Sequence, residues 1–266
     1  MITRIISGAV MIALTVAAVW FAPAWLFLVI AVLLVTLACH EFAALAAASQ
    51  LPFPTVVSTA AAALTCASFS HAVWNGVSLP LDLVLLTAFV ATGAMSLGTW
   101  RGGSDAVASA SAALLPCLYF GLPLGALLAI RESHGPKALF LLMLTVIVSD
   151  SSQYFVGRAF GKRKLAETIS PKKTIEGAYG GFLFGTLLMV LLGGAWLPAM
   201  PLAFRVLLGV TVVALGIAGD LFESMLKRSA GVKDSSSLIP GHGGVLDRID
   251  ALLFAAPVYY VVLRHV

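Results

Sequence analysis

The sequence predicts an all-α, polytopic membrane protein with about nine transmembrane helices and an active site on its cytoplasmic face. Hydrophobic residues make up 60% of the 266 residues and charged residues only 11%, with a mean hydropathy of +1.02. A soluble domain typically carries about 25% charged residues. The apolar runs are continuous and do not alternate with a period of two, which favours helices over a transmembrane β-barrel.

Nine apolar runs approach the length of about 20 residues that a membrane-spanning helix needs. They are 5–22, 25–48, 55–74, 80–99, 107–130, 138–157, 178–197, 202–223 and 245–264. Turn-forming residues separate them, among them Pro23, Asn75-Gly76 and Gly135-Pro136. The first run is long for the apolar core of a signal peptide and more spans follow at once, so we interpret it as a transmembrane helix.

Charged residues are concentrated in two segments. Of 28 Asp, Glu, Lys and Arg residues, nine lie in 150–177 and nine in 220–250. Both segments follow even-numbered spans and both are rich in Lys and Arg, which predicts that they face the cytoplasm. The chain would then begin inside and end outside, although Arg131 and Lys137, after the fifth span, do not fit this side.

This map divides the chain in two. Residues 1–140 are expected to form a scaffold of five to six spans. Residues 141–266 are expected to form the catalytic region, with cytoplasmic loops 157–177 and 224–245. The lack of a long soluble extension is typical of a compact bacterial-type enzyme, so we expect a multi-pass protein of the inner membrane.

The end of the eighth span carries a polar helix face. Asp220, Glu223, Ser224 and Lys227 are spaced i, i+3, i+4 and i+7, which places them on one side of a helix. Charges beside a bilayer are costly and therefore suggest a function, and carboxylates suit a hard divalent cation. For Glu223, local ion pairing at a solvated helix end explains the sequence equally well.

A glycine-rich segment, 231–244, follows this face. Glycines allow backbone N–H groups to converge on an anion. Charged pairs flank the segment, and Asp247 and Asp250, three residues apart, share one face at the start of the ninth helix. The alternatives are an ordinary flexible loop and N-terminal helix capping, which would account for one aspartate more easily than for two.

The other charged segment contains Ser170-Pro171-Lys172-Lys173-Thr174, a tight turn with two cations and two hydroxyls that suits a phosphate. Asp150 lies near the end of an apolar helix, where it would need a cation or a metal. His40 and Glu41, near the end of the second span, are interpreted as an interfacial pair or a helix-end charge.

The composition also excludes some classes. The three cysteines lie in apolar runs without the spacing of a zinc site or of a disulfide framework. The net charge of +4 suits a membrane surface and an anionic ligand, and no aromatic-interleaved basic patch for nucleic acid is present.

Residues 224–250 resemble the signature of the phosphatidate cytidylyltransferases, also called CDP-diacylglycerol synthases. The pattern is Ser224-x-Leu226-Lys227-Arg228-x4-Lys233-Asp234-x-Ser236-x2-Ile239-Pro240-x-His242-Gly243-Gly244-x2-Asp247-Arg248-x-Asp250. The similarity extends to Gly219-Asp220-x2-Glu223 and to Ile169–Gly177. Family members often carry small residues where this chain has Ser152 and Gln153, which concerns local packing more than the reaction.

The resemblance implies a reaction: CTP and phosphatidic acid give CDP-diacylglycerol and pyrophosphate, for phospholipid biosynthesis. It also implies dependence on Mg²⁺, for which we expect two ions about 4 Å apart. Asp220 and Asp247 are expected to be the principal ligands, with Asp250 and Glu223 in support.

The resemblance suggests roles for further residues as well. Lys227, Arg228, Lys233 and Arg248 would hold the triphosphate or the lipid phosphate, and His242 would orient a phosphate or donate a proton. Asp234 is counted with this catalytic set. The expected substrate-binding residues are Asp150, Ser170, Lys172, Lys173, Thr174, Glu176, Ser224, Gly243 and Gly244.

Two other functions remain open at this point. A membrane transferase that joins a nucleotide-activated sugar phosphate to polyprenol phosphate would also use cytoplasmic aspartates and Mg²⁺, but it releases a nucleoside monophosphate. An anion transporter would place its charges at mid-membrane rather than at one face. A homodimer is compatible with a membrane enzyme of this size.

Overall fold

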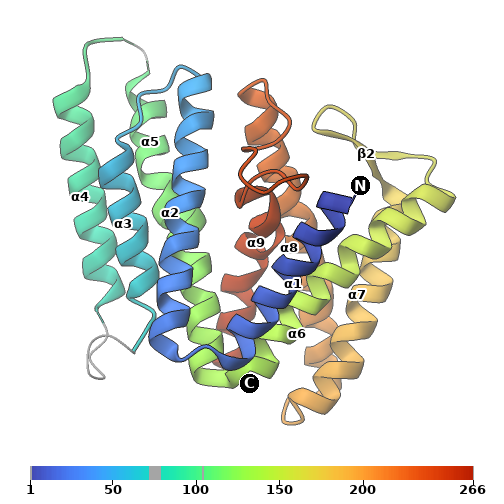
Figure 1. Ribbon diagram of the computed structural model, residues 1–266. Coiled ribbons are helices and arrows are strands. Elements are labelled where there is room, and N and C mark those ends of the chain that lie inside the picture. Colours follow the sequence, from blue (N-terminus) through green and yellow to red (C-terminus); the bar gives the residue numbers. More distant parts are fainter. Residues whose placement is uncertain (1, 72–78, 104, 266) are drawn as a thin grey trace.

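The computed structural model describes residues 2–71, 79–103 and 105–265, with side chains from residue 5 onward, and these residues form helices and one short β-hairpin (Figure 1). The predicted turn at Asn75-Gly76 and the end of the predicted span 55–74 lie outside the described residues. The elements are α1 (Ile2–Phe21), α2 (Ala24–Ala48), α3 (Thr55–Ala67), α4 (Leu81–Thr99), α5 (Ala106–Pro116), the π-helical turn η1 (Cys117–Gly121), α6 (Leu122–Phe160), β1 (Lys164–Ala166), β2 (Ser170–Thr174), α7 (Ile175–Trp196), α8 (Leu202–Ser229) and α9 (Leu246–Leu263).

Five stretches of described helix are long and apolar enough to cross a membrane. They are Ala24–Ala48, Leu81–Thr99, Ala106–Phe160, Ile175–Trp196 and Leu202–Ser229. The protein is therefore all-α and multi-pass, while the count of about nine spans stays a prediction. The longest stretch, of 55 residues, covers the predicted spans 107–130 and 138–157. It bends where the sequence predicts a break, because Gly135 adopts φ 78° and ψ 175° inside it.

Helices α6 to α9 pack together around a common core. Its fully buried members include Leu142 of α6, Met189 of α7, Leu208 of α8 and Tyr259 of α9. The Tyr259 hydroxyl donates a 2.9 Å hydrogen bond to the Ala138 carbonyl oxygen, which ties α9 to α6.

Helices α2 to α5 stand beside these four helices (Figure 1). A second core joins the two parts, with Val35 and Phe42 of α2, Phe120 of η1 and Leu246 of α9 among its buried members. Arg131, which does not fit the predicted cytoplasmic side, binds the end of α1. Its guanidinium donates to the carbonyl oxygens of Val19, at 2.9 Å, and of Ala22.

The hairpin β1–β2 and the segment between α8 and α9 lie toward one end of the molecule, and α9 ends at the other (Figure 1). The antiparallel register pairs Lys164 with Thr174 and Ala166 with Ser170. Helix α8 extends to Ser229, so only the part of the predicted loop 224–245 that follows it leaves the helix. Lys227 and Arg228 occupy the last turn of α8, where cations stabilise a helix end.

Candidate active site

Three carboxylates from two helices meet near the end of the molecule that carries the hairpin. Asp220 and Glu223 of α8 and Asp250 of α9 each offer an oxygen, and these oxygens lie within 4.8 Å of one another. Glu223 is 0% exposed, and the Lys227 ammonium forms an ion pair with it. A buried carboxylate is costly unless a cation compensates it, and the all-oxygen donor set of the three residues suits Mg²⁺.

Close packing of α8 against α9 brings these carboxylates together. A Cβ atom at Gly219 would lie 2.5 Å from the Asp250 carbonyl oxygen and 3.3 Å from the Ala251 Cα. A larger residue at position 219 would push the two helices apart. Position 219 therefore needs a glycine for steric reasons.

Two lysines from different segments pair with the carboxylates. Lys173, in β2, forms an ion pair with Asp220. Lys227 forms ion pairs with Glu223 and, at 2.5 Å, with Asp247 Oδ1. The two charged segments of the sequence thus meet at one place. An arriving divalent cation would compete with these ammonium groups for the carboxylates, and the displaced lysines could hold phosphate oxygens.

Asp247 lies outside the group of three carboxylates and has other partners. Its Oδ2 atom accepts hydrogen bonds from the Ser235 N–H (2.9 Å), the Ser235 hydroxyl (2.7 Å) and the Gly244 N–H (2.8 Å). Gly243 has φ +80°, and a Cβ there would lie 2.7 Å from the same oxygen. These contacts orient Asp247 toward residues 230–245, the segment between α8 and α9, which we call the signature loop. Its role as a principal metal ligand therefore has less support than that of Asp250 and stays a prediction.

Glu41 holds the same loop from the N-terminal half of the chain. It is 3% exposed and lies seven residues before the end of α2, so its interpretation as an interfacial or helix-end charge is wrong. Its Oε1 accepts from the Ser236 hydroxyl (2.7 Å) and the Val245 N–H (2.9 Å). Its Oε2 accepts from the Leu246 N–H (2.8 Å) and lies 2.9 Å from the Ser235 hydroxyl, whose one proton it shares with Asp247 Oδ2.

Glu41 therefore binds the N-terminus of α9, where a negative charge is favourable, and two serines of the signature. A Cβ at Gly244 would overlap both the Glu41 carboxylate and the Ser235 hydroxyl. The sequence does contain a signal for this role, because the apolar residues of α2 continue for seven positions after Glu41. A charge inside an apolar helix is expected to have a specific partner.

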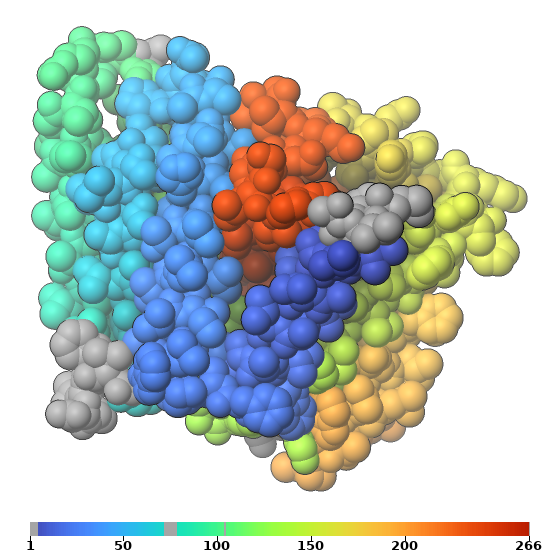
Figure 2. All heavy atoms as spheres, in the orientation of Figure 1, coloured from blue at the N-terminus to red at the C-terminus, as the bar shows by residue number. Residues whose placement is uncertain are grey.

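Helix α1 contacts the loop as well. The Ser7 hydroxyl lies 2.9 Å from His242 Nδ1 and donates a 3.0 Å hydrogen bond to the Pro240 carbonyl oxygen. In the space-filling view, the orange atoms of the segment after α8 lie at the surface between α2 and the hairpin (Figure 2). The loop is thus held from the N-terminal half while one side stays open.

Other predicted site residues have structural contacts. Thr174 accepts a 3.1 Å hydrogen bond from the Gly177 N–H and caps α7. Glu176 Oε2 accepts from the Lys162 N–H (3.0 Å) and the Arg163 N–H (3.2 Å), which closes the base of the hairpin. Their expected contact with substrate remains a prediction.

The remaining predicted residues surround the carboxylates or face solvent. Asp150 of α6 accepts a 3.0 Å hydrogen bond from Gln153 Nε2, Ser170 lies in β2 and Ser224 is buried in α8. Arg228 donates a 2.9 Å hydrogen bond to the Val232 carbonyl oxygen. The exposed charged residues of the predicted site are Asp150, Lys172, Arg228, Lys233, Asp234 and Arg248.

Comparisons with known proteins give one consistent result. The model of a family described as "Cytidylyltransferase family" matches residues 2–266. The chain is similar to the phosphatidate cytidylyltransferase of Pseudomonas aeruginosa, with 38% identity over 233 residues that cover 86% of this chain and 84% of the relative. The Thermotoga maritima phosphatidate cytidylyltransferase is 38% identical over 190 residues, 70% of this chain and 69% of the relative. That of Haemophilus influenzae is 46% identical over 130 residues, 47% and 45% of the two chains.

Proposed function

The chain belongs to the cytidylyltransferase family, and we propose that it condenses CTP with phosphatidate to give CDP-diacylglycerol and pyrophosphate. The relatives named phosphatidate cytidylyltransferase support this reaction. The observation that carries it in this molecule is the meeting of Asp220, Glu223 and Asp250 with lysines from both charged segments. Such a site can hold a metal ion and phosphates together.

The residues fit a Mg²⁺ requirement. Asp220, Glu223 and Asp250 supply oxygen ligands only, and Glu223 is fully buried with the Lys227 ammonium as an ionic partner that a metal ion could replace. In this proposal these three carboxylates hold the metal, with Asp247 as a further candidate. When bound, Mg²⁺ would supply positive charge that offsets the repulsion between the phosphates of the two substrates. The expected number of two ions remains part of the proposal.

The chain's own residues have a simple task in this reaction. The nucleophile, an oxygen of the phosphatidate phosphate, is largely ionised near neutral pH, because the second pKa of a phosphomonoester is about 6. A strong general base is therefore unnecessary. Lys173 and Lys227 would bind phosphate oxygens once a cation replaces them at the carboxylates, and so stabilise charge as pyrophosphate leaves.

The surroundings suggest where the substrates come from. Exposed Lys172, Lys233 and Arg248 lie at the end of the molecule that carries the hairpin and could attract CTP. Lys- and Arg-rich segments favour the cytoplasmic side, and the relatives named above are bacterial. We therefore propose an active site on the cytoplasmic face of the inner membrane. The expected homodimer has no support from the relatives or from the described residues and stays a prediction.

The test is pyrophosphate release by the purified full-length protein in detergent micelles. We expect release only when CTP, phosphatidate and Mg²⁺ are all present, with each omitted in turn. Release of CMP with a polyprenol phosphate acceptor would instead support the sugar-phosphate transferase. Product formed without any closed compartment would exclude a pure transporter.

A further inference from the structure

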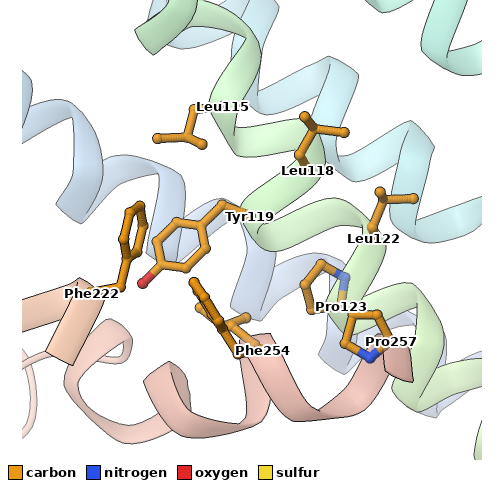
Figure 3. A pocket seen from close by; sticks show the side chains of 9 residues that line it. Leu115, Leu118, Tyr119, Leu122, Pro123, Phe222, Phe254 and Pro257 are labelled. Atoms are coloured by element: carbon orange, nitrogen blue, oxygen red, sulfur yellow. The ribbon is translucent and has the colours of Figure 1, made fainter. Parts of the chain in front are cut away.

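An apolar groove opens between η1, the start of α6, and helices α8 and α9 (Figure 3). Its volume is about 350 Å³, and hydrocarbon and aromatic side chains line it, among them Leu118, Leu122, Phe254 and Pro257. Leu118 is 49% exposed, while Leu253 at the inner wall is 2% exposed. The groove therefore runs from the outside of the helices toward their interior.

Two residues that line the groove belong to the helix turns that carry the carboxylates. Phe222, which lines it, stands between Asp220 and Glu223 in α8, and Phe254 follows Asp250 by one turn of α9. The rings of Phe222 and Phe254 pack 5.4 Å apart between their centroids. Phe254 shares a helix face with Asp250, four residues earlier, so this aromatic pair connects the groove with the helix turns that carry the carboxylates.

Tyr119 occupies the same boundary and has an unused hydrogen-bonding group. Its ring packs edge-on against Phe222 at 5.1 Å and against Phe254 at 6.2 Å between ring centroids (Figure 3). The residue is 5% exposed, and its hydroxyl is buried without a hydrogen-bond partner. The carboxylates of Glu223, Asp250 and Asp220 all interact electrostatically with this hydroxyl. A buried Tyr hydroxyl normally finds a partner, so this one is suited to a ligand.

The backbone at this point is also unusual. Tyr119 lies in the π-helical turn Cys117–Gly121, and π-helical turns occur frequently at functional sites. Gly121 packs where a Cβ would be 2.7 Å from the Ala62 carbonyl oxygen of α3. The turn is therefore held from behind by α3, and the side chains of Leu118, Tyr119 and Leu122 border the groove.

We propose that this groove receives one acyl chain of the phosphatidate substrate, and that the Tyr119 hydroxyl donates a hydrogen bond to an oxygen at the glycerol end of the lipid. This inference rests on the proposed function. It accounts for a mainly apolar groove whose lining residues belong to the same helices as the proposed phosphate-binding site, since the substrate joins a hydrocarbon chain to a phosphate. It also supplies the missing partner of Tyr119.

The test compares phosphatidates of different chain length on variants that fill the groove. With dioleoyl phosphatidate, Leu118→Trp and Leu122→Trp should each raise KM about tenfold, the equivalent of displacing about two methylene groups from apolar contact. With dihexanoyl phosphatidate and with CTP, KM should stay within twofold. Leu191→Trp, at a 63% exposed leucine of α7 outside the groove, is the matched control and should change none of these values.

Tyr119→Phe tests the hydroxyl separately. It should raise KM for both lipids by about three- to tenfold, as expected for one lost hydrogen bond, and leave KM for CTP unchanged. Equal KM values for the Phe variant and the unmodified protein would remove the hydroxyl from the proposal.

Labelling of the unmodified protein covers the case in which a variant fails to fold. A phosphatidate with a photoreactive diazirine on one acyl chain should label residues 115–123 or 253–257, and excess dioleoyl phosphatidate should compete. Labelling elsewhere, or an effect of Leu118→Trp that is equal for long and short chains, would overturn the proposal. So would a disulfide between copies carrying Leu118→Cys in native membranes, because a second copy would then cover the groove. Absence of turnover with both dioleoyl and dihexanoyl phosphatidate in the unmodified protein would instead count against the proposed function.

Discussion

Replacing Glu41 with Gln is the substitution whose effect follows most directly from the structure. Each oxygen of the Glu41 carboxylate accepts one backbone N–H of the segment between α8 and α9 or the start of α9, and lies within hydrogen-bond distance of one serine hydroxyl. Glutamine has nearly the same shape, but one of its two terminal atoms is an NH₂ donor. That donor would face the N–H of either Val245 or Leu246. The serine hydroxyls can rotate to accept, whereas a backbone N–H cannot.

The cost of this substitution can be worked from the contacts. One buried N–H left without an acceptor costs about 1–3 kcal/mol, and losing the negative charge at the start of α9 costs about 0.3–1 kcal/mol more. If turnover requires the loop in this arrangement, a total of about 1.3–4 kcal/mol lowers kcat/KM by about 10- to 900-fold. The loss should be in kcat more than in KM for phosphatidate. The loop contacts Asp247, and it contributes no residue to the lining of the apolar groove.

The assay is pyrophosphate release together with the melting temperature of the purified protein. His40→Gln is the control, since His40 is adjacent but exposed, and it should retain full activity. Glu41→Asp keeps the negative charge and should be more active than Glu41→Gln. A defect caused only by altered side-chain packing would not predict this order. A Glu41→Gln protein with kcat within threefold of the unmodified enzyme would refute the reasoning.

Four further substitutions test other contacts. Asp250→Asn removes one of the three grouped carboxylates and should reduce turnover at least 100-fold and raise the Mg²⁺ concentration needed for half-maximal rate, measured by titration with Mg²⁺. Lys173→Met removes the partner of Asp220; it should raise KM for CTP but tighten Mg²⁺ or Mn²⁺ binding by calorimetry, because the cation no longer competes with an ammonium group. Gly244→Ala should abolish most activity, since its methyl group overlaps Glu41 and Ser235, whereas a rate near normal would mean that the loop rearranges readily. Tyr259→Phe leaves the Ala138 carbonyl without its donor and should lower stability by about 1–2 kcal/mol, seen as a lower melting temperature with unchanged KM values.

Local patterns in the sequence predict much of the fold and of the site. Helices, the break at Gly135 and the shared face of Asp220, Glu223 and Lys227 all depend on neighbours a few residues apart, so periodicity and turn chemistry are sufficient. The short hairpin β1–β2 is harder, because Ser170–Thr174 has little apolar alternation and its pairing depends on Glu176 and the packing of α7 against α6.

Long-range contacts are what the sequence could not provide. Nothing near Glu41 in the sequence indicates that its partners lie about 200 positions later. Likewise, Lys173 and Asp220 form an ion pair although α7 and most of α8 separate them in the sequence. Long-range contacts also decide which three of the four carboxylates Asp220, Glu223, Asp247 and Asp250 lie together. Asp247 and Asp250 are equivalent by spacing, yet only Asp250 joins the group of three, because the loop N–H groups already bind Asp247.

The contacts of Ser7 and Glu41 with the signature loop bear on how the protein can be cut or recombined. All of the signature lies after residue 223, which invites its treatment as a self-sufficient module. A fragment that starts after α5 would lack both residues, and its loop would lose the acceptor for two backbone N–H groups at the start of α9. Chimeras that exchange the first helices between relatives should therefore keep a carboxylate at position 41 and a hydroxyl at position 7.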